Sequence, residues 1–190
     1  MTRILLPESD VHGGSALAEA FDKRRSVRDY AEHELTLAKG GPLLWAAQGI
    51  NDSSGLRTAP SAGALYPLEL ILVARNVAGL KSGVYRYQVR RHALKLIAEG
   101  DFQSRLAKAA LGQVWLADSA AVLVVTAIYE RTTRKYGNRG KRYIRIEVGH
   151  AAQNVLLQAA NNFLTRFVLK GCRRCWLSNV PSEADMGTCA

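Results

Sequence analysis

The chain has 190 residues, of which 48% are hydrophobic and 22% are charged, with a formal net charge of +10. That length is typical of one domain and that composition of a soluble globular protein, so extended disorder, collagen-like repeats and disulfide-dense miniproteins are excluded. The longest apolar stretch, residues 120–128, is about half of the ~20 residues that a transmembrane helix needs. The first residues also lack the apolar run of a secretory signal. We therefore expect a cytoplasmic protein that does not insert into membranes.

The first elements predicted in chain order are two short helices and a turn-rich segment. One helix is expected over residues 15–21, with Ser15 at its N-cap. The second is expected over residues 42–48, because Pro42 suits the first helical position and Gly49 the position after the last. Residues 51–64 are rich in turn-forming residues.

The middle of the chain is predicted to form a sheet. Residues 68–74, 84–89 and 93–97 have the apolar or alternating pattern of consecutive strands. A helix is expected from Asp101 to about residue 111, and residues 120–128 have the valine-rich pattern of a buried central strand.

The longest helix is predicted over residues 143–160, where apolar residues recur at helical spacing. Four residues fall on one stripe of it: Glu147, Ala151, Asn154 and Gln158. Since strands and helices do not alternate as regular βαβ units, the predicted fold class is α+β.

The positive charge is concentrated in one quarter of the chain. Residues 131–180 contain eleven of the 26 Lys and Arg residues and a single acid, Glu147. Seven of these cations form a run: Arg131, Arg134, Lys135, Arg139, Lys141, Arg142 and Arg145. Such a run suits a solvated face, an anion-binding surface or a nucleic-acid-binding surface.

Two further segments carry residues suited to ligand binding. Residues 23–30 place three arginines and a serine within five positions, a set able to bind a phosphate, although a basic surface turn has the same composition. Residues 57–67 hold small residues between two prolines, which lets a flat ligand approach backbone N–H groups or forms an ordinary rigid loop.

Sequence motifs of several other ligand-binding classes are absent. The chain contains neither GxGxxG nor GxxxxGK[ST], and no GxSxG. Its histidines lack the spacing of paired metal ligands, so no metal site is predicted.

Taken together and in order, the motifs resemble the FMN-dependent nitroreductase superfamily and, within it, the SagB-type dehydrogenases, which include enzymes that oxidise azolines to azoles in peptide natural products. The matching strings span about residues 24–160 and are RRSVRDY, LLWAAQGI, RTAPSAGALYPLEL, GVYRY, ALGQ and KYGNRGKRYIRIEVGHAAQNVLLQAA. The resemblance implies a nitroreductase-like fold, with a central, mostly antiparallel sheet flanked by helices. It also implies an intertwined homodimer with FMN at the subunit interface.

The resemblance assigns cofactor-binding roles to residues in several segments. The FMN phosphate and ribityl chain would be bound by Arg24, Arg25, Ser26 and Arg28. The flavin ring would be lined, from the partner subunit, by Pro60, Ser61, Ala62 and Gly63. The remaining cofactor-binding residues would be Gln113, Glu147 and Asn154.

The implied mechanism is ping-pong hydride transfer, in which the flavin carries the redox chemistry. Oxidation of an azoline also releases a proton, which requires a base. By resemblance this catalytic role falls to Lys135 and Tyr136, and the alternative is a surface lysine beside a packed tyrosine. The expected substrate is a small or peptide-derived molecule.

The resemblance ends after Ala160. Residues 1–160 are therefore assigned to a nitroreductase-like FMN-binding domain, and residues 161–190 to an atypical tail that is expected to be irregular. Codons for residues 172–176, read one nucleotide later, can spell V-V-G-A-G, a string similar to the family's flavin-contacting turn. This suggests a frameshift near residue 161, which would make Cys172 and Cys175 accidental. A CxxC redox pair or half of a zinc site is the alternative.

Three functions follow, in order of preference. The first is an FMN-dependent oxidoreductase, the second a flavin-free relative that acts as a scaffold or interaction protein, and the third a basic nucleic-acid-binding protein. In the first, Glu147 is expected to pair with Arg142, Arg145 or another nearby basic residue, as a structural anchor rather than a base.

Overall fold

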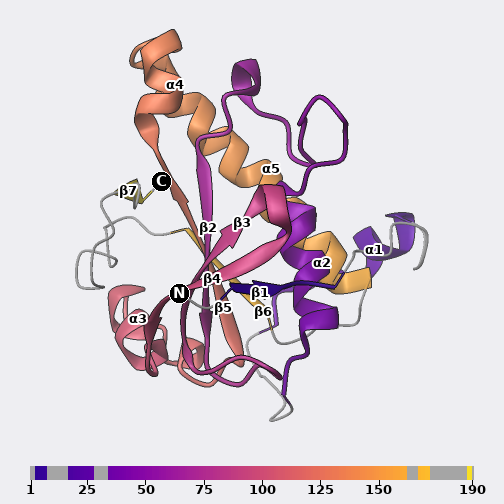
Figure 1. The fold of residues 1–190 in the computed structure, drawn as a ribbon, viewed down its shortest axis with the longest axis vertical. Helices are drawn as coiled ribbons and strands as arrows, with labels where there is room; N and C mark the ends of the chain where they lie inside the picture. Colours follow the sequence, from indigo (N-terminus) through magenta and orange to yellow (C-terminus); the bar gives the residue numbers. More distant parts are fainter. Residues whose placement is uncertain (1–2, 8–16, 28–33, 162–166, 172–187, 190) are drawn as a thin grey trace.

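A seven-stranded sheet forms the centre of the computed structural model, which describes residues 3–7, 17–27, 34–161, 167–171 and 188–189 (Figure 1). The strands are β1 (Arg3–Leu5), β2 (Leu68–Ala74), β3 (Gly83–Gln88), β4 (Ala93–Glu99), β5 (Ala121–Ala127), β6 (Phe167–Gly171) and β7 (Thr188–Cys189). Their order is β1-β4-β3-β2-β5-β6, and β7 also pairs with β5. Only the β5–β6 pair is parallel within the described residues. The prediction of a mostly antiparallel sheet is confirmed.

The antiparallel pair β2–β5 is the core of this sheet. Its register runs over seven residue pairs, from Leu68 opposite Ala127 to Ala74 opposite Ala121. Every residue of β5 is buried, as is every residue of β2 except Glu69. A strand covered on both faces requires an almost continuous apolar sequence, which is why residues 68–74 and 120–128 were recognisable as strands.

Helices cover both faces of the sheet. On one face, α2 (Leu37–Gln48) and α5 (Arg139–Asn161) pack Leu43, Leu44 and Ile144 into a core with Leu70 and Leu123. On the other face lie α3 (Gln103–Ala109) and the short helix η3 (Val114–Leu116), over the intervening residues of β2 and β5. Successive strand residues point to opposite faces, so one strand supplies both cores. The predicted α+β class is confirmed.

Helix α2 begins five residues earlier than predicted, so the assignment of Pro42 to the first helical position is wrong. Lys39 N and Gly40 N donate to Thr36 O and close the first turn. Pro42 lies inside the helix, where its missing N–H removes one backbone hydrogen bond. Gly41 lies close to the chain before it, because a Cβ there would be 3.5 Å from Pro7 O. This non-local packing outweighs the helix-breaking composition of residues 40–42.

Three other helices also differ from prediction. Helix α1 spans Leu17–Lys23, and its predicted N-cap Ser15 lies outside the described residues. Helix α4 (Tyr129–Tyr136) was not predicted, and α5 starts at Arg139 rather than at residue 143. Gly140 allows α4 and α5 to approach closely, since a Cβ there would be 3.1 Å from the Thr132 and Thr133 backbone.

The expectation of an irregular tail is wrong for residues 167–171. These residues form β6, parallel to β5, and satisfy backbone groups along an edge of the sheet that would otherwise be unpaired. Cys172 and Cys175 lie outside the described residues. The frameshift and the division of the chain at residue 160 remain predictions.

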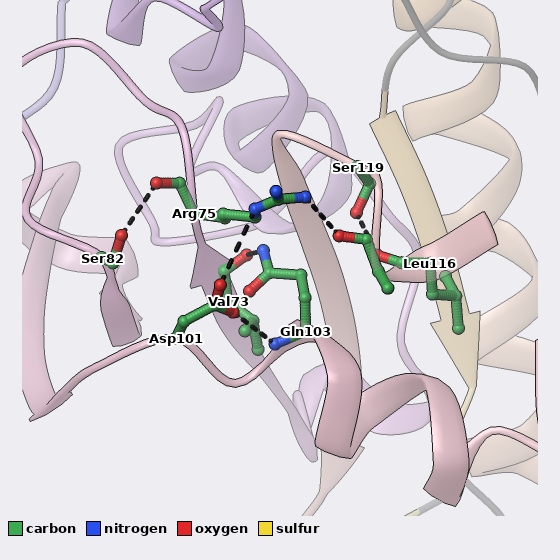
Figure 2. A network of polar contacts seen from close by, with 8 residues as sticks. Val73, Arg75, Ser82, Asp101, Gln103, Leu116 and Ser119 are labelled. Carbon is green, nitrogen blue, oxygen red and sulfur yellow. Dashed lines mark hydrogen bonds and ion pairs between the residues drawn. The ribbon is translucent and has the colours of Figure 1, made fainter. Parts of the chain in front are cut away.

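A polar network closes the end of the sheet where β2 finishes and β5 begins (Figure 2). The Arg75 guanidinium donates to Ala117 O at 2.5 Å and lies 3.7 Å from an Asp101 carboxylate oxygen. The Arg75 carbonyl accepts a hydrogen bond from Ser82 Oγ at 2.8 Å. Asp101 also accepts from Gln103 N at 3.0 Å, but α3 begins at Gln103 with Phe102 as its N-cap, so the prediction that Asp101 caps this helix is wrong by one residue. We refer to Arg75, Ser82, Asp101 and Gln103 as the Arg75 network.

No described helix combines the length and the apolar character required to cross a bilayer.

Candidate functional site

The loop between α2 and β2 has an unusual backbone at the end of the sheet opposite the Arg75 network. Within it, the short helix η1 (Ala62–Ala64) contains Gly63 at φ +64°, and Ala64 and Tyr66 have φ +54° and +45°. Left-handed conformations are costly for residues with a Cβ and recur at functional sites. The turn is held by Tyr66 N, which donates to Ser61 Oγ at 2.9 Å, and by Ala64 N, which donates to Ser61 O at 3.0 Å.

The predicted catalytic pair lies against this loop. A Cβ on Gly63 would be 2.8 Å from Tyr136 Oη and 3.1 Å from Lys135 Nζ. Both side chains come from the last turn of α4, which ends at Gly137 with φ +56°. Lys135 is exposed and Tyr136 is half-buried, and the Tyr136 ring packs edge-on against Tyr143 at 5.2 Å. The fold therefore brings together two segments that lie seventy residues apart in the sequence.

A cluster that we call the loop clamp, made of Gln48, Arg57, Ser61 and Tyr66, joins the two ends of the loop. The Arg57 guanidinium donates to Gln48 Oε1 at 2.7 Å and stacks 4.4 Å from the centre of the Tyr66 ring. Arg57 N donates to Tyr66 Oη at 3.1 Å. Burial lowers the pKa of Arg57, and the charge of Glu69 opposes that effect. The clamp thus fixes residues 57–66 against α2.

Glu147 of α5 lies beneath the same loop, where it is only 3% exposed. Its Oε1 has no hydrogen-bond partner within the described residues, while its carboxyl group interacts with the Ser61 side chain and with the charge of Arg57. Burial raises the pKa of Glu147 to about 7, against an ordinary value of 4.5. Among the described residues no ion pair joins Glu147 to Arg142 or Arg145, which are both exposed, and the cation whose charge acts on Glu147 is Arg57.

Asn154, two turns further along α5, ties helices and loop together. Its Nδ2 donates to Ala46 O at 3.1 Å and to Thr58 O at 3.2 Å. It also borders a groove of about 290 Å³ between α1, α2 and α5. The other residues lining this groove are Leu17, Ala20, Trp45, Ala46, Thr58, Leu157, Gln158 and Asn161.

The predicted phosphate-binding residues lie elsewhere in the chain. Arg24, Arg25 and Ser26 follow the end of α1, which shares the groove with the C-terminal half of α5. Arg25 Nη1 donates to the carbonyls of Asp22 and Arg24, and Ser26 is exposed. Arg28 lies outside the described residues.

The predicted flavin-ring residues are accessible, whereas Gln113 lies on another layer. Pro60 and Gly63 are exposed, and Ser61 and Ala62 are half-buried. Gln113 precedes η3, the short helix on the opposite face of the sheet from α5. One chain therefore groups the loop, the Lys135–Tyr136 pair and Glu147, but does not gather all the predicted cofactor residues at one place.

Sequence reasoning missed the residues that hold the loop from below. The motif over residues 57–67 includes Arg57 and Tyr66 but assigns them no role. The sequence predicts Gln48 only as the last residue of a helix. Arg131 was counted in a basic run, but its Nη1 lies 2.7 Å from Glu69 Oε1 and donates to Tyr66 O at 3.1 Å. The only early signal was a polar residue in an apolar segment, such as Gln48 after Leu43–Ala47.

Known proteins share this chain's sequence and architecture. The profile described as the nitroreductase family matches residues 22–163. The nitroreductase-family protein MJ1384 of Methanocaldococcus jannaschii is 48% identical over 145 residues, which cover 76% of this chain and 73% of the relative. A crystal structure from Ralstonia eutropha assigned to the nitroreductases has a TM-score of 0.73 at 28% identity, covering 84% of this chain and 72% of that one.

Proteins that process peptides are also similar. The microcin B17-processing protein McbC of Escherichia coli is 34% identical over 122 residues, 62% of this chain and 45% of McbC. A chain in the structure of the E. coli microcin synthetase McbBCD complex with truncated pro-MccB17 bound has a TM-score of 0.62 at 29% identity, covering 82% of this chain and 59% of that one. This chain thus spans less than half of McbC. The profile match and the similarity to MJ1384 extend over most of the chain, which therefore belongs to the nitroreductase family.

Proposed function

We propose that this chain is an FMN-dependent oxidoreductase of the SagB type, which acts on a peptide-derived heterocycle. The observation that carries the proposal is the approach of Lys135 Nζ and Tyr136 Oη to Gly63, in the loop suited to a flat ring. Two proton-carrying side chains at the edge of such a loop are what a dehydrogenation needs besides the redox group. The peptide-processing relatives support the substrate class.

The residues present fit FMN. The loop is exposed at Pro60 and Gly63, so a planar ring can reach its backbone, and Gly63 adopts a conformation that suits glycine. Glu147 adds an unpartnered buried oxygen below the loop. Arg24, Arg25 and Ser26 supply two cations and a hydroxyl for a phosphate group.

The arrangement of these groups favours a homodimer. The loop lies near Glu147 in the first half of α5, whereas α1 lies near Leu157 in the second half. Ten residues of helix separate these positions by about 15 Å. Two subunits in a two-fold arrangement can bring the loop of one to the phosphate-binding residues of the other. We therefore propose that the cofactor is bound between two subunits. By its resemblance to the family, we also propose that the protein is cytoplasmic.

The chemistry divides between cofactor and chain. When bound, FMN supplies a two-electron acceptor for a hydride removed from the substrate. Lys135 as its neutral amine, or Tyr136 as its phenolate, would accept the proton that leaves the substrate in the same oxidation, so that one hydride and one proton account for the new double bond. The loop clamp keeps the backbone around Gly63 in place, and the packing of Tyr136 against Tyr143 orients its hydroxyl toward the loop.

The purified protein tests the proposal directly. We expect it to carry FMN, visible in its absorption spectrum, and to oxidise an azoline-containing peptide. Lys135→Met and Tyr136→Phe are expected to retain FMN and to lower turnover by about a hundredfold or more. Lys108→Met on α3 is the matched control and should keep full turnover. A folded protein that binds no added FMN would refute the proposal.

The phosphate assignment has its own test. Replacing Arg24 with alanine removes a charge-assisted bond to the phosphate and should weaken FMN binding by about tenfold or more, without lowering the unfolding temperature of the flavin-free protein. Unchanged FMN affinity in this variant would mean that the phosphate lies elsewhere.

A further inference from the structure

Exposed cations lie close in sequence to Lys135 and Tyr136, at the junction of α4 and α5. We define the basic face as the five residues Arg134, Arg139, Lys141, Arg142 and Arg145. All five are exposed, and each lies within ten residues of Lys135 in the sequence. Figure 1 shows α4 and the start of α5 standing together at the upper end of the molecule, beyond β2 and β5. In the described part of the chain, none of the five residues forms an ion pair, and the Arg139 guanidinium lies over the Tyr143 ring as a cation–π partner.

This charge destabilises the helix that bears it. Four of the five cations lie in the first seven residues of α5, whose first turn has no acidic residue. Cations near a helix N-terminus oppose the helix dipole. Arg139 and Arg142, Lys141 and Arg145, and Arg142 and Arg145 are like charges at i,i+3 or i,i+4 spacing, which repel each other. The segment therefore has an electrostatic energy that a bound anion would lower.

Resting on the proposed function, we propose that the basic face binds an acidic segment of the polypeptide substrate and so delivers its reacting heterocycle to Lys135 and Tyr136. Carboxylates match arginine by paired hydrogen bonds. Since the face flanks the pair, a substrate bound there is tethered beside the reacting groups, which raises its local concentration. Electrostatic attraction would also speed its arrival.

A polypeptide fits this surface better than a nucleic acid. Single-stranded nucleic acids bind basic grooves that also offer aromatic faces for base stacking. The aromatic residues nearest the face, Tyr136 and Tyr143, pack edge-on against each other at 86°. Lys135 Nζ lies 5.5 Å from the Tyr136 ring centre and Arg139 Cζ 5.9 Å from that of Tyr143. These rings are already engaged, which leaves charge as the main means of recognition.

Binding can be measured without turnover. The probes are a fluorescein-labelled peptide of fifteen residues rich in glutamate and a labelled oligonucleotide of fifteen nucleotides, compared by fluorescence anisotropy at low and high salt. We expect the peptide to bind more tightly than the oligonucleotide and to be released at high salt. The double variant Arg142→Glu, Arg145→Glu should weaken peptide binding by about tenfold or more. Arg90→Glu, Arg91→Glu, which changes two exposed arginines on the η2 turn (Val89–Arg91) by the same charge, should stay within twofold.

Cross-linking locates the bound peptide. A carbodiimide joins carboxylates to nearby lysine amines, so we expect the peptide to be linked to Lys141 and Lys135 rather than to Lys39, Lys81 or Lys108. Links mainly to the latter three, equal weakening in the two double variants, or tighter binding of the oligonucleotide would each overturn the proposal. Peptide binding at the basic face by a protein that takes up no FMN would refute the proposed function and leave the basic face established.

Discussion

The two ends of the β2–β5 strand pair carry polar residues in contrasting environments. At the end of β2, the side chains of Arg75 and Asp101 are 44% and 55% exposed (Figure 2). Arg75 donates a hydrogen bond to Ala117 O and lies beside the Asp101 carboxylate. At the other end, beneath the loop that precedes β2, Arg57 and Glu147 are ionisable groups whose pKa values are shifted by burial. The first arrangement stabilises a chain reversal, whereas the second keeps ionisable groups under a strained loop.

Six buried side-chain atoms have no hydrogen-bond partner among the described residues, and three of them, Gln48 Nε2, Thr132 Oγ1 and Glu147 Oε1, belong to α2, α4 and α5. The others are Arg86 Nη2 and Gln88 Oε1 on β3 and Gln103 Oε1 in the Arg75 network. Buried polar groups without partners lower stability. Glu147 lies beneath the loop and Thr132 one turn before Tyr136, so part of this cost falls near the Lys135–Tyr136 pair.

The largest expected effect comes from Glu147. Because its pKa is about 7 when folded and 4.5 ordinarily, the folded state holds this proton to higher pH than the unfolded state. The contribution to stability is therefore present below about pH 4.5 and is lost as pH rises to about 7. Glu147→Gln should abolish that loss. Between about pH 4.5 and 7, the free energy of unfolding measured in urea should therefore change by on the order of 3 kcal/mol less in the variant than in the unaltered protein. Parallel pH profiles for both proteins would show that Glu147 is not held neutral by burial.

The two arginines provide the next test. Arg57→Ala leaves Gln48 and Glu147 without their cationic partner and should lower the free energy of unfolding by about 2 kcal/mol. Arg75→Ala breaks more exposed contacts and should cost about 1 kcal/mol. FMN titration should separate them further, with at least tenfold weaker binding for Arg57→Ala and no more than twofold for Arg75→Ala. If both variants bind FMN equally, the loop clamp does not organise the cofactor loop.

Two glycines with similar backbones test the contact between the loop and the Lys135–Tyr136 pair. Gly63 and Gly79 have φ +64° and +77°, so alanine at either position should cost about 1 kcal/mol in unfolding experiments. A Cβ at Gly63 would displace the tips of Lys135 and Tyr136, whereas at Gly79 the nearest atom is 3.9 Å away. Turnover should therefore fall about tenfold in Gly63→Ala alone, because small misplacements of reacting groups slow the chemistry. Equal turnover in the two variants would contradict this.

The smallest effect is expected from single hydroxyl groups. Tyr66→Phe removes the acceptor of Arg57 N, and Tyr87→Phe on β3 removes a 2.7 Å bond to His92 Nδ1. Each should cost about 1 kcal/mol. Hydrogen exchange at the amides of Ala64 and Tyr66, which bond to Ser61, should be faster only in Tyr66→Phe. Unchanged exchange there would mean that the loop holds its shape without the clamp.

The sequence by itself determined the elements whose signal is local. The strands over residues 68–74 and 120–128 were predictable because burial on both faces demands continuous apolar residues. The loop over residues 57–67 and the Lys135–Tyr136 pair were likewise recognisable, since proline, glycine and motif order are read without knowing the fold.

Only the tertiary structure decided what lies beside these elements. Helix α2 starts early because Gly41 packs against the segment that contains Pro7, and β6 forms because β5 offers an open edge. Arg57 and Glu147 meet beneath the loop because α2 and α5 share one face of the sheet. Burial and charge pairing depend on segments distant in sequence, so no local pattern could show that Glu147 points inward while Arg142 and Arg145 point outward.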